Sequence, residues 1–261
     1  MGNKATTQRI ERAHRTGILS LAGQQYHALP VPIAKELQHQ SSTLAPLLKS
    51  LDLSNNKFTS IPLELGQLTQ LRLLNVSHNN ISALTEEQIV RVFHQLHRLE
   101  HLDLNHNRIQ VLPAFFFGQP ESPPLQSLKL LYLAHNNIQA VPETISNLKE
   151  LVVLDLSHNA LTSVPGEALA VLHATLEELK LEYNTISQVP EALASLEKLT
   201  LLYMDHNKIQ GFPGAIFKRT RVKTVSLEDN PITLRQLMEI DGYQQYEQRR
   251  KGRVDQLVKT V

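Results

Sequence analysis

The sequence predicts an α/β solenoid, with a curved parallel sheet of about nine strands on the concave side and short helices or turns on the convex side. One observation behind this prediction is an eleven-residue pattern, LxxLxLxxNxL, which occurs eight times and is clearest at residues 151–161. A second is the spacing, because successive copies lie 23 to 29 residues apart. The asparagines of the pattern are Asn56, Asn79, Asn107, Asn136, Asn159, Asn184, Asn207 and Asn230.

Each copy of the pattern supplies a short strand whose leucines point inward, followed by a turn and a return segment on the convex side. A single unit cannot bury its own apolar face, so neighbouring units must stack and share one core. The asparagine side chain has both a donor and an acceptor, so it can bond to backbone groups at the bend. We therefore predict that the stacked asparagines form an internal ladder, which is a structural role and not a catalytic one.

These repeats resemble those of the leucine-rich repeat family over residues 16 to about 232. An apolar residue and a proline follow most of the strands, as in Ile61-Pro62, which is similar to the intracellular type of this family. The two ends, Met1-Gly2-Asn3 and Gly242-Tyr243, are similar to those of a small member of it. The resemblance implies a protein-interaction module and does not imply an enzyme.

Residues 1–15 are expected to form an N-terminal arm. The first six residues fit the N-myristoylation pattern, which predicts a lipid on Gly2. The basic residues that follow predict a short basic helix or arm that ends before Gly17. A lipid and a basic arm together predict reversible attachment to a cytosolic membrane leaflet, and hence a cytoplasmic, peripheral membrane location. These basic residues are Lys4, Arg9, Arg12 and Arg15.

The solenoid is predicted to span residues 16–232. Its first unit, residues 16–30, keeps the pattern only in degraded form, which suits a terminal repeat whose outer side faces water. Residues 38–46 are expected to form a loop before the first regular unit. Proline fixes φ and donates no hydrogen bond, so the Leu-Pro and Val-Pro pairs mark the start of each convex turn or helix.

Two units depart from this scheme on the convex side. Thr85-Glu-Glu-Gln88 is a capping box followed by apolar residues at helical spacing, which predicts a helix from about residue 86 to 97. In the next unit we expect Phe116 to lie in the core and its neighbours Phe115 and Phe117 to be harder to bury. Residues 118–124 contain three prolines, which predicts a loop.

Residues 233–261 are expected to form a C-terminal cap. Leu234, Leu237 and Met238 have the spacing of a helix that could cover the last strand. The segment from Arg249 onward is basic, and we expect it to be a solvated end of the chain.

Composition limits the function classes. The net charge is +1, so no overall field attracts nucleic acid, and the chain has no cysteine, which favours a reducing compartment. No apolar run is long enough for a membrane span, and no secretory segment follows Met1. Neither a phosphate-binding glycine loop nor a recognisable catalytic set is present. We therefore expect no enzyme, cofactor or metal, and a monomer that does not bind nucleic acid.

The concave face is the predicted partner site. Side chains alternate along a strand, so the residues between the leucines face outward. In the middle and later units these residues are unusually apolar and aromatic, and an apolar strip framed by charges marks a protein-binding surface. The predicted partner-binding residues are Leu130, Tyr132, Val153, Asp155, His158, Tyr183, Leu201, Tyr203 and His206.

Histidines occupy the place before the asparagine in five units, which is otherwise expected to need only a small polar residue. Strands about 4.8 Å apart would stack the rings of His78, His106, His135 and His158 in one row. Like charges so close should lower the histidine pKa values. Two alternatives therefore stand beside a scaffold: a metal or pH sensor that uses these histidines, and a regulatory subunit of a phosphatase or small GTPase pathway. The histidines concerned are His78, His106, His135, His158 and His206.

Overall fold

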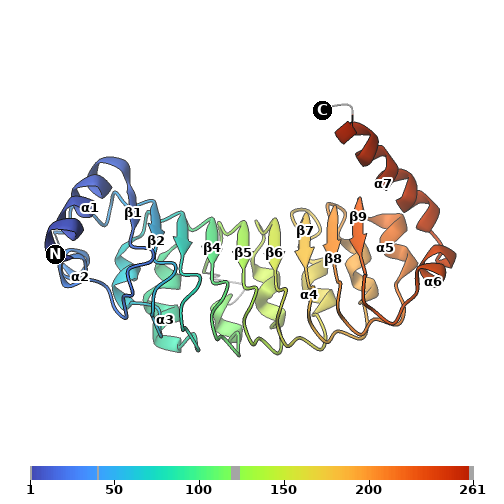
Figure 1. Ribbon diagram of the computed structural model, residues 1–261, viewed down its shortest axis with the longest axis horizontal. Coiled ribbons are helices and arrows are strands. Elements are labelled where there is room, and N and C mark those ends of the chain that lie inside the picture. The colour runs from blue at the N-terminus through green and yellow to red at the C-terminus, as the bar shows by residue number, and fades with distance from the viewer. Residues whose placement is uncertain (1, 40, 119–123, 259–261) are drawn as a thin grey trace.

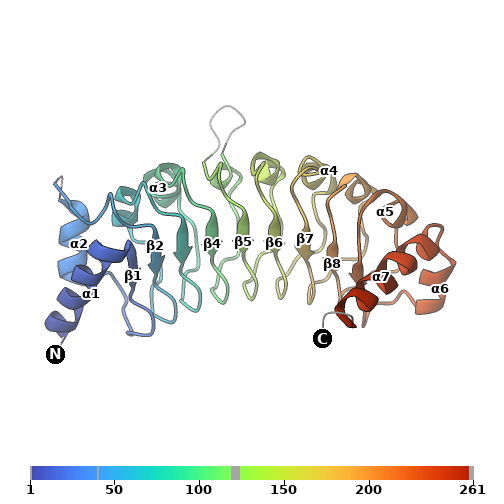
Figure 2. The same cartoon turned by 90° about the horizontal axis from the view of Figure 1, so that it is seen from above.

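The computed structural model confirms the solenoid (Figures 1 and 2). It describes residues 2–39, 41–118 and 124–258, with side chains described for residues 6–39, 41–118 and 124–252. Nine parallel strands form one sheet in sequence order, along the concave side in Figure 1, with the short helices on the opposite side. The strands are β1 (Ile18–Ser20), β2 (Ser50–Asp52), β3 (Leu73–Asn75), β4 (His101–Asp103), β5 (Leu130–Tyr132), β6 (Val153–Asp155), β7 (Glu178–Lys180), β8 (Leu201–Tyr203) and β9 (Thr224–Ser226).

The register of the sheet puts the leucines of successive units in contact. Each strand has three residues, and the middle one is a leucine in every strand except β9, where it is Val225. Leu131, Leu154 and Leu179 are paired in register and are completely buried. The first and third residues of each strand therefore face outward, because successive side chains point to opposite faces.

The asparagine ladder is present as predicted. The amide of Asn136 donates to the carbonyls of Leu104 (3.0 Å), Leu133 (3.1 Å) and Ala134 (3.3 Å). Its carbonyl oxygen accepts from the backbone N–H of Ile109 (3.0 Å). The same pattern recurs from Asn56 to Asn230, so each asparagine joins its own turn to the unit before it.

Short helices and 3-10 turns fill the convex side, and most begin just after a proline. These are α2 (Val31–Gln38), η1 (Leu63–Gln67), α3 (Glu86–Arg91), η2 (Phe93–Gln95), η3 (Ala114–Phe116), η4 (Glu143–Asn147), α4 (Gly166–Ala170), η5 (Glu191–Ser195) and α5 (Gly214–Arg219).

The helix predicted for residues 86–97 is shorter than expected. Its capping box is correct, because the Thr85 hydroxyl accepts from the Gln88 amide and the Gln88 side chain accepts from the Thr85 amide. The helix ends at Arg91, and the backbone at Val92 has φ −112° and ψ −71° before a 3-10 turn begins. Val92, Phe93 and Leu96 are all fully buried, so the bend at Val92 brings these three apolar side chains to the core.

Phe116 is buried as predicted and Phe115 is exposed, but the expectation for Phe117 is wrong. Its ring is fully buried, with its centroid 4.9 Å from that of Phe116. Asn147 of the next unit donates to the carbonyls of Phe117 and Gly118, which holds this segment against the core. Within the loop predicted for residues 118–124, residues 119–123 lie outside the described part.

The N-terminal segment is a packed helix. Helix α1 (Gly2–Thr16) packs on β1 and α2 and buries Thr6 and Ala13. It ends at Gly17, whose φ of +69° suits glycine because it has no Cβ. Part of the loop expected at residues 38–46 packs against the core, because Leu44 and Ala45 are buried. The Glu36 carboxylate holds it there by accepting from the Thr43 and Leu44 amides.

The predicted cap helix exists as α6 (Leu234–Glu239), but it buries none of its residues. Helix α7 (Tyr243–Val258) covers the last strand instead, with Tyr246 only 4% exposed. The first basic residue of the tail is not merely solvated, because the Arg249 guanidinium donates to the carbonyls of Phe217 (2.6 Å) and Val222 (3.1 Å). No helix in the described part of the chain is both long and apolar enough to cross a membrane.

Candidate binding face on the concave sheet

The predicted partner residues fall into two rows on the units of β5 to β8. One row lies on the strands: Leu130 pairs in register with Val153, and Tyr132 pairs with Asp155. Leu201 and Tyr203 lie on β8. The other row lies in the turns after the strands and contains His158, Tyr183 and His206, whose rings are stacked. The structure therefore brings the predicted residues together on one side of the solenoid.

The apolar strip is smaller and more broken than the sequence suggests. Leu130, Val153 and Leu201 are each half-buried rather than exposed. Between Val153 and Leu201 the register places Glu178, whose carboxylate lies 2.9 Å from the Lys180 ammonium group. This ion pair divides the strip into an apolar part around Tyr132 and a second part around Tyr203.

A column of acids that was not among the predicted partner-binding residues completes this face. It follows the third leucine position of the last three units and contains Glu182, Asp205 and Glu228. Burial raises the pKa of Glu182, and the charges of Asp155 and Asp205 raise it further. The column could have been found in the sequence, because each of these acids lies two residues before the asparagine of its unit.

Lys180 is the cation at the centre of this acidic region. Burial acts to lower its pKa, but the hydrogen bond and charge of Glu178, with the charges of Asp155 and Glu182, produce a net rise. Lys180 therefore remains charged at neutral pH. Lys180 pairs with Glu178 alone, and Asp155 and Glu182 nearby leave the surrounding face net negative, so this face is complementary to a basic partner.

Asp155 has a structural task as well as a place on the face. It is 9% exposed, and its Oδ1 accepts from the Ser157 amide (3.0 Å) and hydroxyl (2.7 Å). Asp103 similarly accepts from the Asn105 amide (2.9 Å), and burial raises its pKa. These carboxylates hold the turn that follows their strand.

The predicted row of stacked histidines is present and is longer than expected. Six rings stack in order along the turns: the centroid distances are 4.0 Å for His78–His106, 4.0 Å for His106–His135, 3.9 Å for His135–His158, 4.1 Å for His158–Tyr183 and 4.0 Å for Tyr183–His206. We call these six residues the ring stack. Tyr183 continues the row of histidines because its ring has a similar flat shape.

The expectation that this place needs only a small polar residue is wrong. Every residue of the ring stack has φ between +51° and +54°, which is the left-handed region. Asparagine, aspartate and histidine are enriched there among residues other than glycine, and the remaining units indeed have Asn55 and Asp229. This position therefore requires a residue that tolerates the left-handed backbone conformation. Because neighbouring side chains in the row are about 4 Å apart, flat rings that can stack are then favoured.

The geometry disfavours the metal alternative. The lone pairs of imidazole nitrogens lie in the ring plane, so nearly parallel stacked rings direct them side by side and not toward one point. The interplanar angles between neighbouring histidines are 11° to 14°. Among the residues that the structure describes, no cluster of histidine, aspartate and glutamate could hold a metal ion.

The ring stack should make stability depend on pH. Burial lowers the pKa of His106, His135 and His158, and the charges of neighbouring histidines lower it further. The prediction of lowered pKa values is therefore confirmed for these three, although burial and not repulsion is the larger cause. Below the unfolded pKa of about 6.5 the unfolded chain binds more protons than the folded one, so stability falls as pH falls.

We expect the melting temperature to drop between pH 7.5 and pH 5.5, and the drop to be smaller in the His106→Asn/His135→Asn/His158→Asn variant. Asparagine keeps the left-handed conformation, as Asn55 shows in the first regular unit. Glu182 and Asp103 have raised pKa values and act in the opposite direction at more acidic pH. Melting curves that change equally in both proteins would contradict this role of the ring stack.

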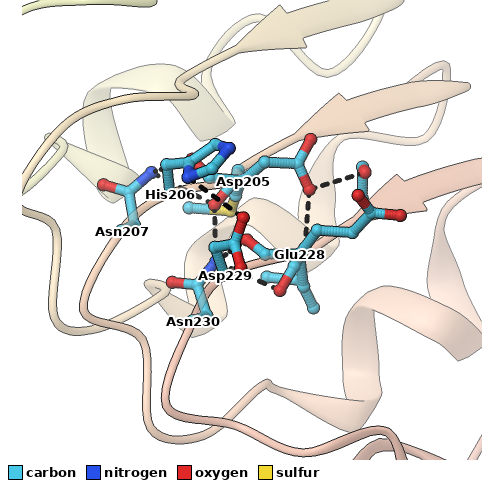
Figure 3. Close-up of polar contacts among 9 residues, drawn as sticks. Asp205, His206, Asn207, Glu228, Asp229 and Asn230 are labelled. Atoms are coloured by element: carbon cyan, nitrogen blue, oxygen red, sulfur yellow. Dashed lines mark hydrogen bonds and ion pairs between the residues drawn. The ribbon is translucent and has the colours of Figure 1, made fainter.

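The polar contacts of the last turns are shown in Figure 3. The Asp205 carboxylate accepts from the Ser226 hydroxyl and the Glu228 amide, both at 2.6 Å. His206 Nδ1 lies 3.2 Å from the Asp229 carboxylate. The acids at this end are thus partly used to join the last two units, and Glu228 remains exposed.

The fold and this face define a repeat solenoid with an outward-facing strand surface. The family model for the leucine rich repeat matches residues 46–109, 126–175 and 149–209, which together cover more than half of the chain. The chain belongs to the leucine-rich repeat family.

Its relatives are longer proteins. The chain is 31% identical over 155 residues to leucine-rich repeat and calponin homology domain-containing protein 1 of Mus musculus, covering 59% of this chain and 19% of that protein. It is 35% identical over 142 residues to podocan-like protein 1 of Homo sapiens, covering 52% and 26%. It is 34% identical over 124 residues to the probable serine/threonine-protein kinase pats1 of Dictyostelium discoideum, covering 48% and 4%. The chain therefore spans about a quarter or less of the length of these relatives.

Solved structures show the same fold. A leucine-rich repeat protein of Leptospira interrogans is similar with a TM-score of 0.68 and 29% identity, over 86% of this chain and 59% of that one. The plant peptide hormone receptor RGFR1 in complex with RGF2 is similar with a TM-score of 0.54 and 21% identity, over 81% of this chain and 38% of that one. At this identity the second likeness concerns the fold alone.

Proposed function

We propose that this chain is a non-catalytic scaffold that binds a basic protein partner on its concave face. Leucine-rich repeat proteins act as protein-interaction scaffolds, which supports the general class. The observation that carries the specific proposal is the face of β5 to β8, where Tyr132, Tyr183 and Tyr203 stand among an excess of carboxylates. Tyrosine is a frequent anchor of binding energy, and charge complementarity sets the choice of partner and the association rate.

Tyr132→Ala combined with Tyr203→Ala should abolish capture of the main partner while the melting curve stays close to that of the wild type. Each interface anchor typically contributes about 2 kcal/mol or more, so losing both weakens binding by roughly a thousandfold. The matched control is Val111→Ala with Phe115→Ala, because both side chains are exposed and lie outside the concave face. Affinity capture followed by mass spectrometry measures the loss.

Undiminished capture by the tyrosine variant, or an equal loss in the control, would move the site away from the concave face. Charge reversal gives an independent check. Glu182→Lys should slow association with a basic partner, and the effect should shrink as salt is raised. A partner whose association does not depend on salt would contradict its basic character.

The second part of the proposal is a lipid on Gly2 that tethers the scaffold to a cytosolic membrane face. The first six residues carry the modification pattern. Arg12 and Arg15 are exposed on α1 and make no ion pair among the described side chains, so both are free to face an anionic leaflet. The ends of the chain, Met1-Gly2-Asn3 and Gly242-Tyr243, resemble those of leucine-rich repeat-containing protein 57.

Gly2→Ala should make the protein fully cytosolic, and Arg9→Gln/Arg12→Gln/Arg15→Gln should release it in part. A single myristoyl chain gives only a partition constant of roughly 10⁴ M⁻¹, so a second, basic contact is needed for retention. The intact mass of the N-terminal peptide from a eukaryotic host is the measurement. A free or acetylated Gly2 would remove this part of the proposal and leave the concave face untouched.

A regulatory subunit of a signalling enzyme, in a phosphatase or small GTPase pathway, is the alternative. The same capture experiment separates the two. A scaffold should retain several membrane-resident partners, and these should be lost with Gly2→Ala. A regulatory subunit should retain one enzyme in fixed stoichiometry with or without that substitution.

A further inference from the structure

The C-terminal edge of the sheet forms a groove beyond the tyrosines of the concave binding face, and Glu228, the last acid of that face, also lines the groove. The groove runs between β9 on one side and helices α6 and α7 on the other, with a volume of about 800 Å³. Leu234 and Met238 of α6 line it and are 66% and 57% exposed. Leu227 of the last unit lines its wall and is only half-buried. A buried apolar column therefore ends here in partly open apolar side chains.

The sheet itself shows what this edge is built to bind. Inside the sheet, two alternate backbone amides of each unit donate to the next strand. Leu156 N–H donates to the Lys180 carbonyl (2.9 Å), and His158 N–H donates to the Glu182 carbonyl (2.8 Å). One unit before the edge, Met204 and His206 donate in the same way to Ser226 and Glu228. The geometry is thus repeated along the whole solenoid.

In the last unit the equivalent amides are those of Leu227 and Asp229. Among the residues that the structure describes, neither donates a hydrogen bond. An open strand edge with unpaired donors is a template for pairing with another chain. Helix α7 fills only the neighbouring place: the Tyr246 hydroxyl accepts from Val225 N–H (3.1 Å) and donates to the Val225 carbonyl (3.4 Å). The edge is therefore capped at its centre and open at the turn.

We infer that this edge binds an extended peptide segment of a partner protein, which adds as a short parallel strand beyond β9. Three residues of the peptide would lie against the last unit in the same way as Lys180, Leu181 and Glu182 lie against the unit before them. Two carbonyls of the peptide, two residues apart, accept from Leu227 and Asp229. The residue between them is apolar and covers Leu227 and Leu237, as Leu181 covers the unit before it.

Charge selects the following side chain. Glu228 is exposed and makes no ion pair in the described part of the chain, whereas the neighbouring Asp229 already pairs with His206. Inside the sheet, the equivalent residue is Glu182, whose carbonyl accepts from the His158 amide. In the bound peptide this is the residue whose carbonyl accepts from the Asp229 amide, and it lies beside Glu228. A lysine or arginine there would pair with Glu228, so the recognised segment is any residue, then an apolar residue, then a basic residue. Main-chain pairing supplies binding and these two side chains supply specificity.

The test uses the full chain and two acetylated, amidated pentapeptides, Thr-Leu-Lys-Thr-Thr and Thr-Leu-Glu-Thr-Thr. Titration is followed by the NMR signals of backbone amides. We expect the lysine peptide to shift the Leu227 and Asp229 amides, and the glutamate peptide to bind about fivefold more weakly. Glu228→Lys should reverse this preference. Glu197→Lys is the matched control, since Glu197 is an exposed acid outside the groove and should leave the preference unchanged.

Three results would overturn the inference: shifts confined to other residues, equal binding of both peptides, or slow exchange of the Leu227 and Asp229 amides before any peptide is added. The last result would mean that the chain already fills its own groove. The concave-face variant Tyr132→Ala/Tyr203→Ala should bind the lysine peptide normally. A negative result with the peptides would therefore count against the groove alone and not against the proposed function of the concave face.

Discussion

Leu154→Asp should unfold several units together and not just one. Leu154 is completely buried and lies in register between Leu131 and Leu179, so a charge there is enclosed by three units. An isolated buried carboxylate costs several kcal/mol, which is a large part of the roughly 5–15 kcal/mol that stabilises a typical domain. Because units are stable only through their neighbours, the loss should spread along the sheet.

The measurement is urea unfolding followed by circular dichroism. Two controls bracket the result. Leu154→Met keeps volume and polarity, so its cost should be below about 1.5 kcal/mol. Val111→Asp adds the same charge at a side chain that is 65% exposed, and its effect should stay within about 0.5 kcal/mol. A cooperative wild-type transition in Leu154→Asp would contradict the repeat frame.

Asn136→Leu should be the second most damaging change. The side chain has the right size, but it removes one donor group and one acceptor group from a buried position. The carbonyls of Leu104, Leu133 and Ala134 and the amide of Ile109 would lose this partner. Each carbonyl keeps a second donor, namely the Asn107 side chain, the Asn159 side chain and the His106 amide, whereas the Ile109 amide is left without a partner. One unpaired buried amide costs about 1–3 kcal/mol and the lost bonds to the carbonyls add to it, so we expect a total loss of about 3 kcal/mol.

The neighbouring Asn137 provides the matched control. It is exposed, so Asn137→Leu should change the free energy of unfolding by no more than about 0.5 kcal/mol. Comparing the two variants in the same urea experiment separates the ladder from a general effect of removing an asparagine. Equal costs at the two positions would show that the ladder contributes little.

The sequence predicts the solenoid because the same residue types recur at fixed positions in every unit. Each position of the pattern has the same surroundings in every unit. The leucines of the pattern therefore identify the core, and Asn136 and its equivalents identify the ladder. The ring stack is partly predictable for the same reason, since strand spacing places His106 beside His135. The left-handed backbone at these residues was missed, because the pattern marks a position but does not give its φ angle.

Features that depend on long-range packing were not predictable. Tyr246 and Arg249 cap the last unit through backbone groups more than twenty residues away, and their spacing in the chain resembles an ordinary polar helix. Leu234 and Met238 look like a covering helix, yet they remain exposed because α7 takes the covering place. The division of the apolar strip by Glu178 follows from register, which sets neighbours across strands and not along the chain.

The most direct test of the concave binding face is hydrogen–deuterium exchange of the chain alone and in complex with its captured partner. We expect protection on binding to be concentrated in the segments that contain β5 to β8 and the turns that follow them. The convex segments at η3, η4 and η5 should exchange at the same rate in both states. Protection confined to the convex segments, with unchanged exchange at β5 to β8, would contradict the central claim.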